Sequence, residues 1–89
     1  MNLSGNWQVR IREIVYKQLA RFPVKDRERL LRAIDGLSAN PFIGDIQKMG
    51  GEENVWRRRI GSYRIRYEIY VQERVIYVFF VERRTSKTY

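Results

Sequence analysis

The residues best suited to chemistry in this chain are arginines at two-residue spacing. Arg57 and Arg59 are separated by one residue, and Arg64 and Arg66 repeat that spacing just beyond Gly61-Ser62. Because alternate residues share a face of a strand and a Gly-containing two-residue turn predicts a hairpin, we expect the four guanidinium groups to gather on one face. Such a group favours an anion, since each guanidinium presents a planar fork of donors that matches phosphate oxygens. The alternative is that these side chains extend into water or pair with acidic residues. The acidic candidates for that pairing are Glu68, Glu73 and Glu82.

The composition excludes several other kinds of chemistry. Without cysteine, the chain has no disulfide, thiol nucleophile or thiolate metal ligand. Without histidine, it has no imidazole base or imidazole metal ligand. Neither a zinc-type ligand spacing nor a glycine-rich phosphate or dinucleotide loop is present, so we expect no metal and no cofactor. The remaining candidates are Lys, Arg, Tyr, Asp, Glu, Ser and backbone groups.

The charge of the chain points to an anionic partner. Eighteen basic residues against ten acidic ones give a net charge of +8 and a sequence pI of about 10.3. Among anionic polymers, nucleic acid is the commonest partner of a small, basic, aromatic-rich domain. The alternative reading is a cationic surface that serves only solubility.

The chain shows no sign of membrane insertion or export. No segment approaches the roughly 18 consecutive apolar residues of a membrane span, and residues 1–5 lack the apolar run of a secretory signal. We therefore expect a cytoplasmic protein that does not contact a membrane.

Hydrophobic periodicity predicts one α+β domain over residues 1–89. Alternation predicts a strand over residues 7–11, and helical spacing then predicts helices over about 13–22 and 25–38, ended by prolines. Strands are predicted over residues 46–49, 55–60, 63–71 and 75–81. The last is apolar on both faces, so we expect a central strand covered on both sides. The resulting fold is an N-terminal β-strand and an antiparallel helical hairpin packed on one face of a mostly antiparallel β-sheet.

Several of these segments carry a family resemblance. They are Trp7-Gln-Val-Arg-Ile, Leu37-Ser-Ala-Asn-Pro41, Val55-Trp-Arg-Arg-Arg-Ile-Gly61, Tyr63-Arg-Ile-Arg-Tyr-Glu68, Val81-Glu-Arg-Arg84 and the final Tyr89. In this order and at this spacing the chain resembles the RelE/ParE superfamily of type II toxin–antitoxin toxins over essentially its whole length. The resemblance implies the RelE-like fold.

The RelE-like branch implies a ribosome-dependent endoribonuclease that cleaves mRNA through the RNA 2′-hydroxyl, without metal, and so inhibits translation. The catalytic positions implied by the resemblance are Lys48, Arg59, Arg84 and Tyr89. In that scheme Lys48 acts as base, the arginines stabilise the charge on phosphorus and Tyr89 stacks on a base near the cut. The residues expected to bind RNA are Arg57, Arg64, Arg66, Arg83 and Lys87.

The resemblance also implies partners. They are the ribosome, its mRNA and an acidic, partly disordered antitoxin, with the toxin a monomer when free and a hetero-oligomer when bound to antitoxin. Two other functions stay open. One is a ParE-like inhibitor of DNA gyrase that cleaves nothing, and the other is a non-catalytic RNA-binding family member. Gly50 keeps them open, because some RelE-like toxins carry a second basic residue there.

Overall fold

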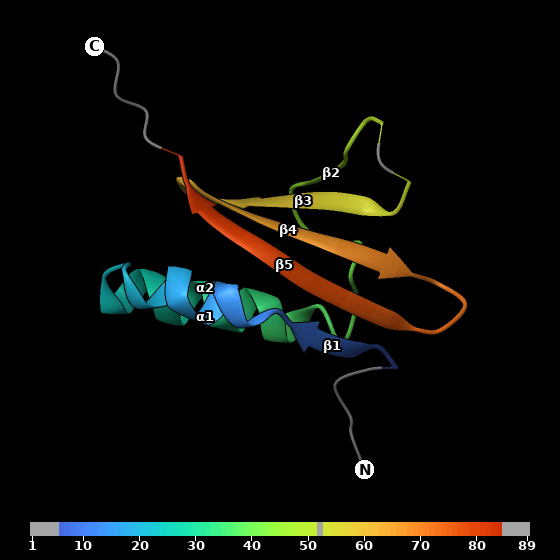
Figure 1. Cartoon of the computed structure of the whole chain (residues 1–89), viewed down its shortest axis with the longest axis horizontal. Coiled ribbons are helices and arrows are strands. Elements are labelled where there is room, and N and C mark those ends of the chain that lie inside the picture. Colours follow the sequence, from blue (N-terminus) through green and yellow to red (C-terminus); the bar gives the residue numbers. More distant parts are fainter. Residues whose placement is uncertain (1–5, 52, 85–89) are drawn as a thin grey trace.

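The chain folds as two helices packed against a five-stranded sheet in the computed structural model, which describes residues 6–51 and 53–84 (Figure 1). The elements in chain order are β1 (Gln8–Ile11), α1 (Glu13–Ala20), α2 (Val24–Gly36), β2 (Ile46–Lys48), β3 (Val55–Ile60), β4 (Tyr63–Tyr70) and β5 (Val75–Arg83). This order confirms the predicted fold class, although both helices end two residues earlier than the periodicity indicated.

The sheet has the strand order β1-β5-β4-β3-β2. The chain's first strand pairs in parallel with its last, and the other three pairings are antiparallel. The turn between β3 and β4 is as tight as predicted, and Gly61 takes a φ of +57° there, a conformation that L side chains rarely adopt. That turn fixes the register of the two arginine-bearing strands.

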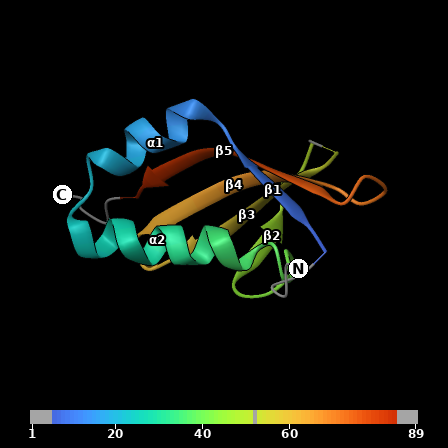
Figure 2. The same cartoon turned by 90° about the horizontal axis from the view of Figure 1, so that it is seen from below.

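Both helices lie on one face of the sheet, as an antiparallel hairpin (Figure 2). Pro23 separates them, and the Arg27 side chain of α2 holds the end of α1. Its Nε donates to the Leu19 carbonyl and its Nη2 to the Phe22 carbonyl, both at 3.1 Å. The Leu19 carbonyl also accepts the Phe22 N–H at 3.1 Å, so the Arg27 bonds add to the backbone bonds that end α1 and tie α2 to it. Neither helix of the described residues is long and apolar enough to cross a membrane.

The core lies between the helices and the sheet. It is built from aliphatic residues of α1, α2, β4 and β5 together with two buried tyrosines, Tyr63 and Tyr67. The Tyr63 hydroxyl donates to Asp26 Oδ2 at 2.6 Å, and the Tyr67 hydroxyl donates to the Pro41 carbonyl at 3.0 Å. Burial raises the pKa of both phenols, that of Tyr67 to about 12. The core tyrosines therefore stay protonated and bonded at neutral pH.

The structure differs from the prediction for the burial and the end of β5. This strand is interior to the sheet, but it is covered on one face only, and Tyr77 is 42% exposed. The reason is that both helices pack on the same side, which leaves the other face open. Two apolar helix residues, Ile14 and Leu31, are also exposed, at 42% and 38%. Finally, β5 continues to Arg83, so the polar segment from Glu82 begins within a strand.

Candidate nucleic-acid interface

The pairing of β3 with β4 brings the four predicted arginines together. Arg57 lies opposite Arg66, and Arg59 lies opposite Arg64. The alternate residues of β4, such as the buried Ile65, face the helices. The arginines therefore occupy the face that the helices leave open. We call these four residues the arginine cluster. Like charges placed directly opposite each other destabilise a free sheet, so the cluster favours an anionic ligand.

Polar neighbours hold three members of the cluster in place. Arg59 Nε lies 3.0 Å from Asp45 Oδ2, and Arg66 Nη2 lies 3.1 Å from Glu82 Oε2. Arg57 Nη2 donates to the side-chain oxygen of Gln47 at 2.6 Å. Of the acidic candidates seen in the sequence, Glu82 forms its pair as anticipated. The Asp45 pair was not anticipated, because Asp45 precedes β2 and reaches Arg59 only through the sheet.

Several donors of the cluster remain without a partner. The Nε atoms of Arg57, Arg64 and Arg66 are shielded from solvent, yet they have no hydrogen-bond partner among the described residues. Buried polar groups in folded proteins are normally hydrogen-bonded, and a guanidinium carries fixed charge as well. Arg58, on the helix side, also has a shielded Nε without a partner among the described residues, so this feature is not confined to the cluster.

The two arginines at the end of β5 make different contacts. The Arg84 backbone N–H donates to the Ser62 carbonyl at 2.6 Å, which fastens the chain to the β3–β4 turn. Continued alternation puts Arg84 on the same side as Glu82 and the cluster. Arg83 turns to the helix side, where its guanidinium carbon lies 5.5 Å from the centre of the Tyr63 ring. The structure thus places Arg83 on the helix side, and alternation beyond the strand end leads us to expect Arg84 beside the cluster.

Lys48 does not join the cluster. It pairs with Trp56 across β2 and β3, and Trp56 pairs with the buried Tyr67, so Lys48 belongs to the helix-side face. A difference of one residue in a strand moves a side chain to the other face, and local spacing alone does not reveal the register of β2. Two further predicted residues, Lys87 and Tyr89, lie outside the described residues.

The arrangement can stabilise negative charge but offers little acid–base chemistry. Arginine stays protonated in proteins, so the cluster and Arg84 can bind phosphate oxygens and stabilise a developing oxyanion. Within residues 6–51 and 53–84, no group of three acidic side chains is placed to hold a metal ion. The described part of the site is therefore an electrostatic one.

Comparison with known proteins decides the family. The model of the ParE toxin of the type II toxin–antitoxin system parDE matches residues 9–87. The chain belongs to the RelE/ParE superfamily of toxins. It is 30% identical to a protein designated as toxin RelE1 of Methanocaldococcus jannaschii, over 88% of this chain and 90% of that protein.

Solved structures agree with this toxin family. RelE in the archaeal RelE–RelB complex of Pyrococcus horikoshii is 27% identical, with a TM-score of 0.79 over 91% of this chain and 98% of that one. The isolated RelE toxin of E. coli is 18% identical, with a TM-score of 0.75 over 92% of this chain and 88% of that one, and shows the shared fold. The relatives from Methanocaldococcus jannaschii and Pyrococcus horikoshii support the RelE-like branch, as the sequence indicated.

Proposed function

We propose that this toxin is a ribosome-dependent endoribonuclease that cleaves mRNA in the cytoplasm and thereby stops translation. The observation that carries the proposal is the arginine cluster, in which four guanidinium-bearing residues pair across β3 and β4 on the open face of the sheet. A backbone phosphate supplies charged acceptors for such a group of guanidinium donors. Relatives named as RelE toxins support the same activity class.

The proposed reaction uses the RNA's own 2′-hydroxyl. The 2′-hydroxyl releases its proton to water as its oxygen attacks the adjacent phosphorus. The bond from phosphorus to the 5′-oxygen breaks, and the 5′-oxygen takes up a proton from water. The products are a 2′,3′-cyclic phosphate and a free 5′-hydroxyl. Arg59 and Arg84 stabilise the charge that builds on the non-bridging oxygens, and the other arginines hold the flanking phosphates. Tyr89 keeps its proposed role of stacking on a base beside the cut.

The position of Lys48 changes one part of the scheme. Its pairing with Trp56 puts Lys48 on the helix-side face, so we leave it out of the proposed scheme. A site without a strong base depends on the alignment of the attacking oxygen with the bond that breaks. Alignment alone contributes several orders of magnitude in rate, and the ribosome provides it by holding mRNA in a fixed path.

The test is primer extension on an mRNA in a translation extract with purified toxin. Discrete cuts within codons are expected, and they should disappear when ribosomes are removed. Arg59→Ala should abolish them while the protein stays folded. Intact mRNA in the presence of folded wild-type toxin and active ribosomes would refute the proposal.

A second function has one observation in its favour, the match of residues 9–87 to the ParE toxin model. A ParE-like toxin would inhibit DNA gyrase and leave mRNA whole. Gyrase-dependent DNA breaks without mRNA cuts, measured with the same protein preparation, would support this second function and contradict the first.

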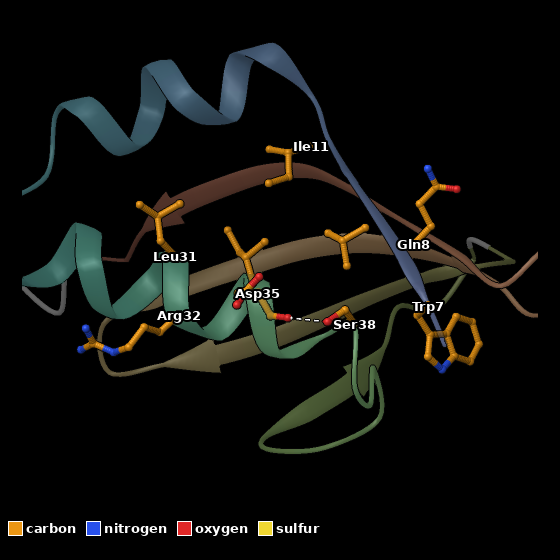
Figure 3. A pocket seen from close by; sticks show the side chains of 9 residues that line it. Trp7, Gln8, Ile11, Leu31, Arg32, Asp35 and Ser38 are labelled. Carbon is orange, nitrogen blue, oxygen red and sulfur yellow. Dashed lines mark hydrogen bonds between the residues drawn. The ribbon is translucent and has the colours of Figure 1, made fainter. Parts of the chain in front are cut away.

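We also propose an acidic antitoxin as the partner that silences the toxin, as the RelE–RelB complexes among the relatives suggest. A groove of about 750 Å³ runs between β1 and α2 (Figure 3). Its apolar lining includes Val9 and Ile11 from β1 and Leu31 and Ile34 from α2. β1 is an edge strand, so the groove also borders free backbone groups. A peptide that orders on binding can fill such a groove, and a monomeric toxin then becomes a hetero-oligomer.

A further inference from the structure

The open face of the sheet has a second half, which is aromatic. Tyr77 lies opposite Glu68, and Phe80 lies opposite Arg66, so both rings share the face of the arginine cluster. Tyr70, at the end of β4, lies on the same face. We call Tyr70, Tyr77 and Phe80 the aromatic strip. Tyr77 is 42% exposed and the other two are partly exposed, which is unusual for rings on a central strand.

The strip is continuous with the arginine cluster. The guanidinium carbon of Arg66 lies 6.0 Å from the centre of the Phe80 ring. Further along, the Tyr70 hydroxyl donates to Glu68 Oε1 at 2.9 Å, so this ring is held by a side chain of its own strand. Charged groups and π-faces therefore stand side by side on one surface, positioned by regular strands.

This mixture fits one class of partner. Unpaired nucleotides present phosphates to cations and bases to aromatic rings, and proteins that bind single strands combine both features. A partner helix would need a continuous apolar surface, but Arg66 and Glu68 lie among these rings. The aliphatic groove between β1 and α2 is the surface suited to a protein segment, and it is separate from the open face.

We infer that the aromatic strip stacks against unpaired bases of an RNA strand whose phosphates lie on the arginine cluster. The RNA identity of the ligand rests on the proposed function, whereas the stacking itself is measurable without cleavage. The strip thereby extends the toxin's contact with its substrate beyond the nucleotides at the cut.

The test is binding of a short, fluorescently labelled, single-stranded oligodeoxynucleotide, which lacks the 2′-hydroxyl and so cannot be cut by the proposed reaction. Tyr77→Ala should weaken binding roughly tenfold, since one stacked base is worth about 1–3 kcal/mol. Tyr77→Phe should bind like wild type, because stacking needs only the ring. The matched control is Tyr16→Ala, which removes a 53% exposed tyrosine from α1 in the helix layer and should change nothing.

The salt dependence separates stacking from phosphate contact. Arg57→Gln should lower the slope of log affinity against log salt by about 0.7, the value for one phosphate contact on a single strand. Tyr77→Ala should leave that slope unchanged. Phe80→Ala repeats the test at a second ring, with circular dichroism to verify folding.

Wild-type affinity in Tyr77→Ala and Phe80→Ala would overturn the inference. Variants that keep oligonucleotide binding but lose the antitoxin would also overturn it, because the strip would then belong to a protein interface. If ring-dependent binding is found while mRNA stays whole in the translation extract, stacking is supported and the nuclease proposal fails by itself.

Discussion

Arg57 and Arg66 face each other across β3 and β4, yet only Arg66 has a carboxylate partner, Glu82. Arg57 is bonded to the neutral Gln47 and has other arginines at its opposite and flanking positions. The charges of Arg57 and Arg66 therefore affect the stability of the fold differently, although both side chains lie on the same face of the sheet. Arg57 adds electrostatic repulsion to the free protein, whereas Glu82 offsets the charge of Arg66.

Arg57→Gln should therefore stabilise the free toxin. We expect a gain of about 0.2–1 kcal/mol in low salt, the usual size of a cross-strand pair effect. The gain should shrink above about 0.1 M salt, where the Debye length falls below roughly 10 Å and repulsion between exposed charges is screened. Urea unfolding at low and high salt measures it. Arg66→Gln is the control and should bring no gain, since it breaks the pair with Glu82. Equal destabilisation by both variants would contradict this account.

Arg84→Ala should reduce cleavage roughly 10²-fold or more, the scale for losing one preorganised charge donor. The fold should persist, because the contact of Arg84 with the β3–β4 turn is made by its backbone N–H. Arg83→Ala is the matched neighbour: its guanidinium lies over Tyr63 on the helix side, so cleavage should change little. Ribosome-dependent cleavage rates compare the two. A larger loss for Arg83→Ala would reverse the assignment.

The groove between β1 and α2 leads to a prediction about the antitoxin. Leu31→Asp should raise the dissociation constant by accelerating release, because it places a charge in the apolar lining. The association rate should fall with added salt in wild type and variant alike, since the net charge of +8 steers an acidic partner. Val24→Glu, which changes an exposed position of α2 that does not line the groove, should leave release unchanged. Surface plasmon resonance resolves both rates, and an association rate independent of salt would count against steering.

The raised pKa of Tyr67 leads us to expect that the protein loses stability at alkaline pH. Burial raises the pKa of this phenol from 10.0 to about 12, so the folded state keeps a proton that the unfolded chain releases earlier. The resulting stabilisation is complete below pH 10 and disappears as the pH rises to about 12. Tyr67→Phe should cost about 1 kcal/mol at neutral pH, through the lost bond to the Pro41 carbonyl, and should show a shallower alkaline decline. Urea unfolding across this range tests it, with Tyr16→Phe as the exposed control.

The sequence determined the elements, the family and the membership of the arginine cluster. Periodicity located the two helices and the strands, because apolar side chains must repeat with the period of the element that buries them. The spacing around Gly61-Ser62 was sufficient to predict that the four arginines gather on one face, because a two-residue turn leaves little freedom in register. The structure pairs Arg57 with Arg66 and Arg59 with Arg64.

Only the tertiary structure decided which face each remaining residue joins. Lys48 lies on the helix-side face, and Asp45 contacts Arg59 of the cluster. Neither position could be predicted, because β2 pairs with β3 across a longer loop, and local spacing does not reveal the register of such a pairing. The apolar run of β5 looked like a strand buried on both sides, but both helices pack on one side of the sheet. Tyr77 and Phe80 therefore lie partly exposed on the arginine face, since burial depends on where distant helices pack and not on a strand's own composition.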